Sequence, residues 1–239
     1  MVHSALLAML LTSMGFAIGG FLSVILKALK SNVSFVYSFC AGIILGLIYF
    51  DILPESIELG SYIGVFIGFL IGVLIFIFLH SSTDYLLEKA TANNAFFHTA
   101  FLLAVSIAIH NFPIGVAIGV SQDKELNHSL LHLLVLHNIP EGIALFMPVI
   151  LARSRVSTWF KLICIVTLPM GGGIVLGNVF DQMYSSTVWA VVLSIAIGIM
   201  VMVTIKEILF EALKHSAVVK CFSYVVMGIA IVWVYLKVI

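Results

Sequence analysis

The chain has 239 residues, of which 62% are hydrophobic and 9% are charged, and its mean hydropathy is +1.23. Soluble domains carry about 45–50% apolar and about 25% charged residues, so this composition excludes a soluble globular enzyme and a disordered chain. Eleven Lys and Arg balance eleven Asp and Glu, which excludes the basic surface that binds nucleic acid. The sequence therefore predicts an integral membrane protein.

Apolar runs of about 20 residues, long enough to cross a bilayer, occur eight times. They lie at residues 4–28, 33–54, 60–80, 96–121, 127–151, 157–179, 187–211 and 217–237. Every connection between them is short except 81–95, so residues 1–239 are expected to form a single domain. The predicted fold is an all-α membrane bundle of eight transmembrane helices.

The distribution of Lys and Arg among the connections predicts the orientation, because cytoplasmic loops carry the excess. Two cationic residues, Lys124 and Lys237, lie at one end of the bundle. The other nine follow spans 1, 3, 5 and 7: Lys27, Lys30, Lys89, Arg153, Arg155, Lys161, Lys206, Lys214 and Lys220. This bias places both termini outside.

The most specific signal is a repeated hexapeptide, H-N-x-P-x-G, which begins at His110 in the fourth span and at His137 in the fifth. The two spans are expected to be antiparallel neighbours, and each histidine lies about 20 Å from the connection between them at 1.5 Å per residue. Both motifs should therefore reach the same depth, near the middle of the bilayer.

The chemistry of these motifs suits a divalent metal ion. His137 and Glu141 lie four residues apart on one face of the fifth span, with Asn138 on the flank of Glu141. Imidazole, carboxylate and amide oxygen are ligands for Zn²⁺, Fe²⁺, Mn²⁺ or Cd²⁺. Two histidines that only hydrogen-bond across kinked helices are the structural alternative, but this alternative leaves the ionisable Glu141 unexplained in the membrane.

A weaker repeat places carboxylates at both ends of the predicted bundle. Asp51 and Glu55 end the second span at the outer side, and Glu207 and Glu211 end the seventh at the inner side. Spans 1–3 and 6–8 would then be inverted repeats around spans 4 and 5, a 3+2+3 organisation found in secondary transporters. The alternative is that these carboxylates are solvated helix ends screened by Lys206 and Lys214.

Other polar residues carry weaker expectations. His3, His80, His98 and His215 fall at span ends, where a solvated imidazole is ordinary, and His128 and His132 could make an accessory contact to an ion. The three cysteines lie in apolar runs without metal-site spacing, so we expect them to be packing residues.

These residues resemble the ZIP family of zinc and iron transporters, the Zrt/Irt-like proteins, and especially its compact prokaryotic members. The resemblance covers nearly the whole chain: eight spans, external termini, the paired H-N-x-P-x-G segments and the D-x-x-P-E sequence at 51–55. It implies a transporter and not an enzyme, which carries a divalent metal, most of all Zn²⁺, into the cytoplasm across the plasma membrane, or the inner membrane of a Gram-negative cell. Family members are often homodimers and work by an elevator-like or related alternating-access motion.

The resemblance also implies a ligand set. The first metal position of the family falls on His110, His137 and Glu141, and the second falls on Asn111, Asn138 and Glu141. The ion is cargo, so no cofactor is expected.

This chain departs from the family pattern at several ligand positions. It has Ile114 and Leu168 where the family usually carries polar or acidic ligands, and Asn138 where an aspartate is common. One core carboxylate cannot readily neutralise two divalent ions, which predicts a single bound metal.

Two rival functions use the same residues. An intramembrane hydrolase would hold a catalytic zinc ion with His110, His137 and Glu141, and Glu141 would activate water. A haem electron carrier would use the two histidines as axial ligands, but it gives Glu141 and the prolines no role.

Overall fold

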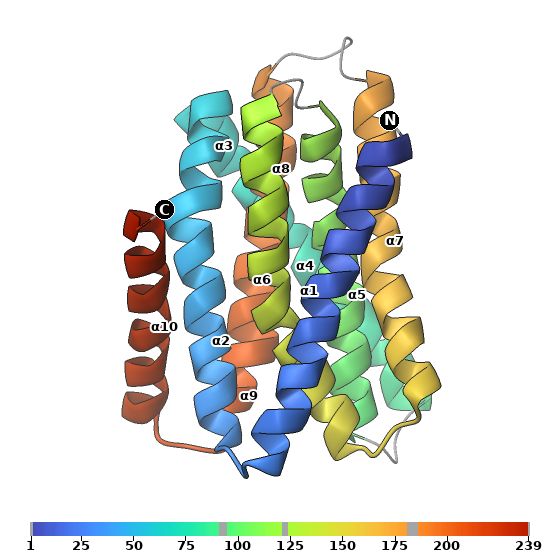
Figure 1. Ribbon diagram of the computed structural model, residues 1–239, viewed down its shortest axis with the longest axis vertical. Helices are drawn as coiled ribbons and strands as arrows, with labels where there is room; N and C mark the ends of the chain where they lie inside the picture. The colour runs from blue at the N-terminus through green and yellow to red at the C-terminus, as the bar shows by residue number, and fades with distance from the viewer. Residues whose placement is uncertain (1, 91–94, 121–123, 181–185, 239) are drawn as a thin grey trace.

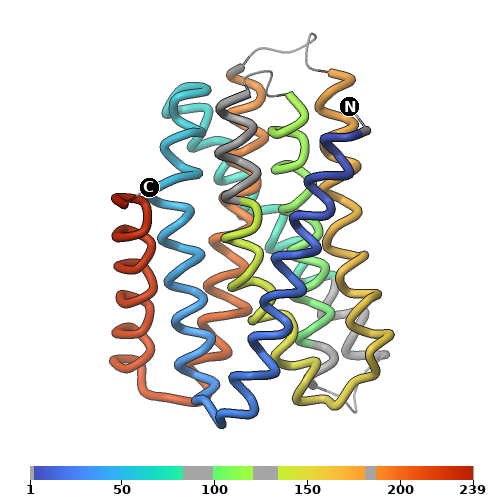
Figure 2. The backbone as a smooth tube through the Cα atoms, viewed as in Figure 1, coloured from blue at the N-terminus to red at the C-terminus, as the bar shows by residue number. Residues whose placement is uncertain are grey.

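The computed structural model describes residues 2–90, 95–120, 124–180 and 186–238, and every regular element in these ranges is a helix. Eight spans within them are long and apolar enough to cross a membrane, which confirms the prediction. The spans are formed by α1 (Val2–Ala28), α2 (Val33–Leu47) with α3 (Leu53–Leu59), α4 (Tyr62–Ala90), α5 (Ala95–Val120), α6 (Lys124–Leu151), α7 (Val156–Phe180), α8 (Ser186–Val203) with α9 (Phe210–Leu213), and α10 (Val218–Val238). They run up and down one bundle, and both termini lie toward the same end (Figures 1 and 2).

Two spans contain a wider helical turn that the sequence did not predict. A π-helical segment, η1 (Ile48–Ile52), joins α2 to α3, and a second, η3 (Thr204–Leu209), joins α8 to α9. In the first, the amide of Leu53 donates to the carbonyl of Ile48. A π turn inserts one extra residue into a helix and often occurs at functional sites. It also lets the second span continue past Pro54 to Leu59, beyond the predicted end at residue 54.

Residues 81–90, which belong to the long connection predicted at 81–95, are helical. Helix α4 continues to Ala90, eight residues beyond the apolar part of its span at Tyr62–Ser82. Residues 81–90 are polar enough to leave the membrane but contain no Gly or Pro that would end a helix.

The helices associate as four close pairs: α1 with α6, α5 with α7, α2 with α10, and α4 with α8. The first two pairs pack together through α1 with α7 and α5 with α6, and we call these four helices the inner group. The remaining helices, α2, α4, α8 and α10, are called the outer group. The inner group meets the outer group chiefly where α5 contacts α8 and α2 contacts α6.

Glycines make the paired helices approach closely. A Cβ atom added at Gly173 of α7 would lie 2.2 Å from the carbonyl oxygen of Phe112 on α5, and one at Gly198 of α8 would lie 2.3 Å from that of Phe69 on α4. Small residues allow such approach in membrane bundles. None of the eighteen glycines of the chain, all of which are described, makes a close contact between the inner and outer groups.

The glycine contacts recur at fixed spacings along the sequence. Gly19 of α1 packs on Ile139 of α6, and Gly173 of α7 packs on Phe112 of α5. Gly173 lies 154 residues after Gly19, and Phe112 lies 27 residues before Ile139. In the outer group, Gly42 packs on Val225, and Gly198 packs on Phe69. Gly198 lies 156 residues after Gly42, and Phe69 lies 156 residues before Val225. The two π-helical segments begin 156 residues apart as well.

Candidate metal site

The five residues of the repeated motif lie in the interior of α5 and α6, the two most enclosed spans. Of the α5 span, 72% is buried, against 22% of the α10 span. None of these five residues is more than 3% exposed: His110, Asn111, His137, Asn138 and Glu141. Burial of this many polar groups in a membrane bundle is costly, so the arrangement requires compensation.

His110 and Glu141 meet across the interface between α5 and α6. The Nε2 atom of His110 lies 3.2 Å from Oε1 of Glu141, but the contact is not aligned as a hydrogen bond. In a tetrahedral zinc site, ligand atoms about 2.0–2.2 Å from the ion lie about 3.3–3.6 Å from each other. The separation of the two atoms therefore matches neighbouring ligands of one ion.

The two asparagines face the helices that pair with their own. The Nδ2 atom of Asn111 donates to the carbonyl oxygen of Val166 on α7 at 2.8 Å. The Cβ atom of Asn138 occupies the space beside Gly15 on α1. Each asparagine therefore lies where the site approaches a second inner-group helix.

Six buried polar atoms of His110, Asn111, Asn138 and Glu141 have no hydrogen-bond partner among the described residues. They are both ring nitrogens of His110, Oδ1 of Asn111, both amide atoms of Asn138, and Oε2 of Glu141. A buried polar group without a partner costs about 1–3 kcal/mol. Such a cluster is the feature expected of a polar ligand site, because a ligand that supplied these contacts would recover the cost.

The expected ligands do not all converge. Among the side chains that the structure describes, no three of His, Cys, Asp or Glu come close enough to one another to hold a metal ion. The structure therefore brings His110 to Glu141 and leaves His137, one helical turn before Glu141 on α6, outside that contact.

The two positions that depart from the family pattern have different surroundings. Ile114 is buried in the core, one turn after His110, whereas Leu168 is 60% exposed on the outside of α7. The neighbour of Leu168, Thr167, is buried and contacts Ser13 of α1 at 3.4 Å. Helix α7 contacts the site through the backbone carbonyl of Val166, which accepts from Asn111.

The acidic residues of the weaker repeat lie in or beside the two π-helical segments. Asp51 belongs to η1 and Glu55 to the following α3, and both are half-buried. Glu207 belongs to η3 and Glu211 to the following α9. Helices α3 and α9 lie toward opposite ends of the bundle (Figure 1), as the sequence predicted for these carboxylates.

Glu207 and His80 form a contact that sequence reasoning missed. Nδ1 of His80 on α4 lies 2.9 Å from Oε1 of Glu207, and their side chains are 31% and 7% exposed. The imidazole also stacks on Phe76, with ring centroids 5.4 Å apart. The expectation of an ordinary solvated imidazole at His80 is therefore wrong, because this imidazole contacts a buried carboxylate.

Glu211 has the surroundings of a screened helix end. Its carboxylate lies 2.7 Å from Nζ of Lys214 and 3.4 Å from Nε2 of His215. The side chains of His98, His128 and His132 lie outside the described part of the chain. All three cysteines are free, with Cys40 and Cys221 buried.

Fold and site together define a multi-pass membrane protein with a buried histidine, asparagine and carboxylate centre between two neighbouring spans. The family model described as ZIP zinc transporter matches residues 88–235, which include all five site residues, and the chain belongs to this family. The chain is also similar to zinc transporter 7 of Arabidopsis thaliana, with 30% identity over 88 residues. That match covers 37% of this chain and 24% of the plant protein.

Proposed function

We propose that the protein transports a divalent metal cation, Zn²⁺ before Fe²⁺, Mn²⁺ or Cd²⁺, across the membrane into the cytoplasm. The observation that carries this proposal is the buried contact of His110 with Glu141, surrounded by polar atoms without partners. The ion would bind His110, His137 and Glu141, and oxygen atoms of Asn111, Asn138 or water would complete the shell. The family match does not support the hydrolase alternative.

Alternating access would come from motion of the inner group against the outer group. Close glycine contacts hold helices together within each group, and they are missing between the groups. This arrangement supports two bodies that slide past each other with the site carried on the inner one. The recurring shifts of 27, 154 and 156 residues support the inverted 3+2+3 repeat, which supplies two equivalent ways for the groups to meet.

The carboxylates at the two ends would attract the ion and release it. Asp51 and Glu55 would lie at the external entrance, and Glu207 at the cytoplasmic exit, with Glu211 as a weaker candidate because Lys214 and His215 already contact it. We also propose that both termini lie outside the cell, that the protein forms a homodimer, and that it resides in the plasma membrane.

We expect one zinc ion per chain. Glu141 is the one carboxylate among the five proposed ligands, and a second dication beside it would be largely unneutralised at low dielectric. Titration of the purified protein with zinc, followed by elemental analysis after gel filtration, measures the stoichiometry. Two tightly held ions that are both lost in the double variant His110→Ala/Glu141→Ala would contradict this prediction.

Acidification is expected to weaken uptake. Histidine and carboxylate bind metal only when deprotonated, so protons compete with the ion. Lowering the external pH from about 8 to about 5, the range in which histidine changes charge, should reduce the initial rate of uptake. A rate that stays constant over this range at subsaturating zinc would show that protons do not compete at the site.

Growth of cells that lack their own zinc uptake tests the transport function. The wild-type chain should restore growth at limiting zinc, and His137→Ala should not, although it reaches the membrane in equal amount. His215→Ala is the matched control, since this histidine lies at the bundle end and is half exposed. Rescue by His137→Ala equal to that by wild type would overturn the proposed site.

A further inference from the structure

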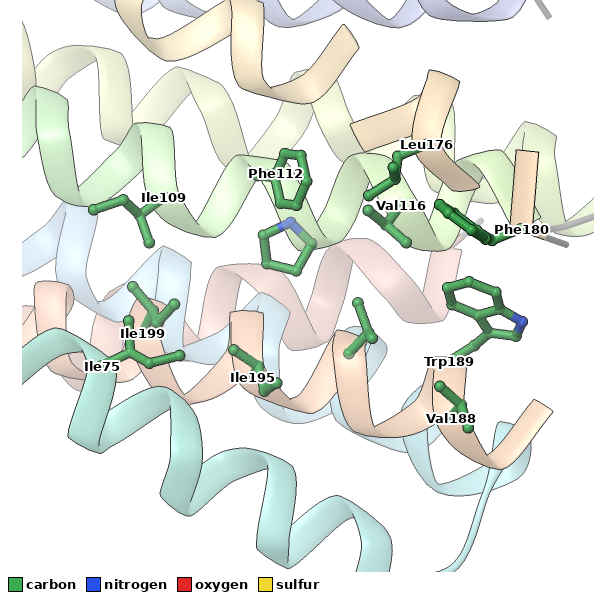
Figure 3. A pocket seen from close by; sticks show the side chains of 12 residues that line it. Ile75, Ile109, Phe112, Val116, Leu176, Phe180, Val188, Trp189, Ile195 and Ile199 are labelled. Atoms are coloured by element: carbon green, nitrogen blue, oxygen red, sulfur yellow. The ribbon is translucent and has the colours of Figure 1, made fainter. Parts of the chain in front are cut away.

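A cavity of about 440 Å³ lies between the inner and outer groups. One wall is formed by α5 and α7, including Ile109, Phe112 and Val116, and the other by α4 and α8, including Ile195 and Ile199 (Figure 3). The wall on α5 is directly adjacent in sequence to His110 and Asn111. Whatever occupies this cavity therefore touches the helix that carries the proposed site.

The lining excludes water as the occupant. Its twelve residues are aliphatic, aromatic or proline, and Trp189 is the one whose side chain carries a polar atom. A buried water needs two to four polar partners, whereas apolar cavities of about 150 Å³ stay dry and bind small hydrocarbons. Phe112, Leu176 and Val188 at its margin are each about 40% exposed, so the cavity opens on the lipid-facing surface of the spans.

The length of the cavity matches one leaflet of the bilayer. Along α8 its lining runs from Val188 to Ile199, a rise of eleven residue steps or about 16 Å at 1.5 Å per residue. Half of a hydrocarbon core of about 30 Å is about 15 Å. Val188 and Trp189 lie at the start of the span Thr187–Leu213, where tryptophan commonly meets the headgroups.

The opposite side of the bundle has two smaller cavities whose linings correspond to that of the first. We call the first cavity one groove and these two cavities together the second groove. The two smaller cavities, of about 220 Å³ each, lie between α1, α6 and the outer-group helices α2 and α10. Residues that line the first cavity correspond to residues that line the other two when the same shifts of 27 and 156 residues are applied. The corresponding pairs include Phe112 and Ile139, Pro113 and Pro140, Ile75 and Ile231, and Val192 and Val36. The proposed inversion of the repeats would place the second groove in the opposite leaflet.

We propose that each groove holds a single acyl chain of a membrane phospholipid, one from each leaflet. The chains fill the seam between the inner and outer groups, where no glycine brings the helices into close contact, and keep it packed as the groups move. Lipid hydrocarbon is the medium around the spans, and its shape and chemistry fit the lining. This inference concerns lipid binding and does not depend on the proposed transport of metal.

Quenching of tryptophan fluorescence tests the first groove. The double variant Trp159→Phe/Trp233→Phe leaves Trp189 as the one tryptophan, and Trp159→Phe/Trp189→Phe leaves Trp233. Trp189 is 8% exposed and Trp233 is 50% exposed. In phosphatidylcholine vesicles with brominated acyl chains, we expect Trp189 to be quenched as strongly as Trp233, because a chain inside the groove contacts it. Weak quenching of Trp189 beside strong quenching of Trp233 would overturn the proposal and indicate a groove closed by helices or by a second copy.

A filled groove provides the control. Val192→Phe, added to the variant that retains Trp189, places a ring in the cavity and should abolish most of the quenching. Val175→Phe adds the same ring to an exposed position of α7 outside the lining and should leave the quenching unchanged. Equal quenching in both variants would mean that bromine reaches Trp189 from outside the groove. Weak quenching of Trp189 beside strong quenching of Trp233 overturns the proposal even if Val192→Phe does not fold.

Discussion

Replacing Glu141 with glutamine is expected to weaken zinc binding by at least about a hundredfold, or about 2.7 kcal/mol. The substitution keeps the shape of the side chain but removes the negative charge that opposes the buried dication. Attraction between unlike charges is strong where water is excluded, so a neutral amide oxygen cannot replace the carboxylate. Isothermal titration calorimetry of the purified protein with zinc measures the change in affinity.

The matched control for this substitution is Glu211→Gln. This carboxylate lies at the bundle end, 2.7 Å from Nζ of Lys214, and its loss should change zinc affinity by less than about threefold, as expected for a screened surface charge. If Glu141→Gln binds zinc like the wild-type protein and remains folded, the site between α5 and α6 is wrong. If both substitutions weaken binding equally, Glu211 belongs to the site.

Three consecutive glycines of α7, Gly171, Gly172 and Gly173, include the position with the largest expected change in stability. Gly173→Ala should destabilise the protein by about 2–3 kcal/mol, because overpacking of a close contact forces the backbone to shift. The added methyl group would lie 2.2 Å from the carbonyl oxygen of Phe112 and 2.8 Å from the amide nitrogen of Val116. Both atoms belong to the backbone of α5 and cannot rotate away, so α5 and α7 must separate.

The neighbouring glycine is the control for this prediction. A methyl group at Gly172 would meet nothing within 4 Å, so Gly172→Ala should be neutral or stabilise the helix by up to about 1 kcal/mol. Thermal unfolding in detergent measures both effects. We expect the Tm of Gly173→Ala to lie about 5–10 °C below that of the wild-type protein, and the Tm of Gly172→Ala to lie within about 3 °C of it. Equal Tm values for the two variants would show that the close approach of α5 and α7 does not contribute to stability.

Much of the fold follows from hydropathy and from one repeated motif. Apolar length alone predicts the eight spans, because the bilayer imposes nearly the same length on each. The antiparallel order of spans 4 and 5 places His110 and His137 at one depth, and the contact of His110 with Glu141 agrees with that prediction. The helical periodicity of α6 also places His137 one turn before Glu141, but it does not predict how far the imidazole lies from the contact.

Other features depend on contacts that sequence patterns do not encode. The two π-helical segments follow no composition rule, and hydropathy does not predict that Glu207 in η3 contacts His80 on α4. Residues 81–90 read as a connection because they are polar, although nothing in them ends a helix. The pairing of α5 with α7 and of α1 with α6 depends on glycines that let distant segments approach closely. Hydropathy does not distinguish these glycines from other small residues.

Zinc uptake into proteoliposomes tests the central claim most directly. Purified wild-type protein in sealed vesicles with an internal zinc-sensitive dye should take up external Zn²⁺ with saturable kinetics, and Fe²⁺, Mn²⁺ and Cd²⁺ tested in parallel would rank its selectivity. Vesicles with His137→Ala or Glu141→Ala should take up no more zinc than empty vesicles. Stoichiometric binding of zinc by the wild-type protein without any uptake would contradict transport and favour a metal sensor or enzyme built on the same ligands.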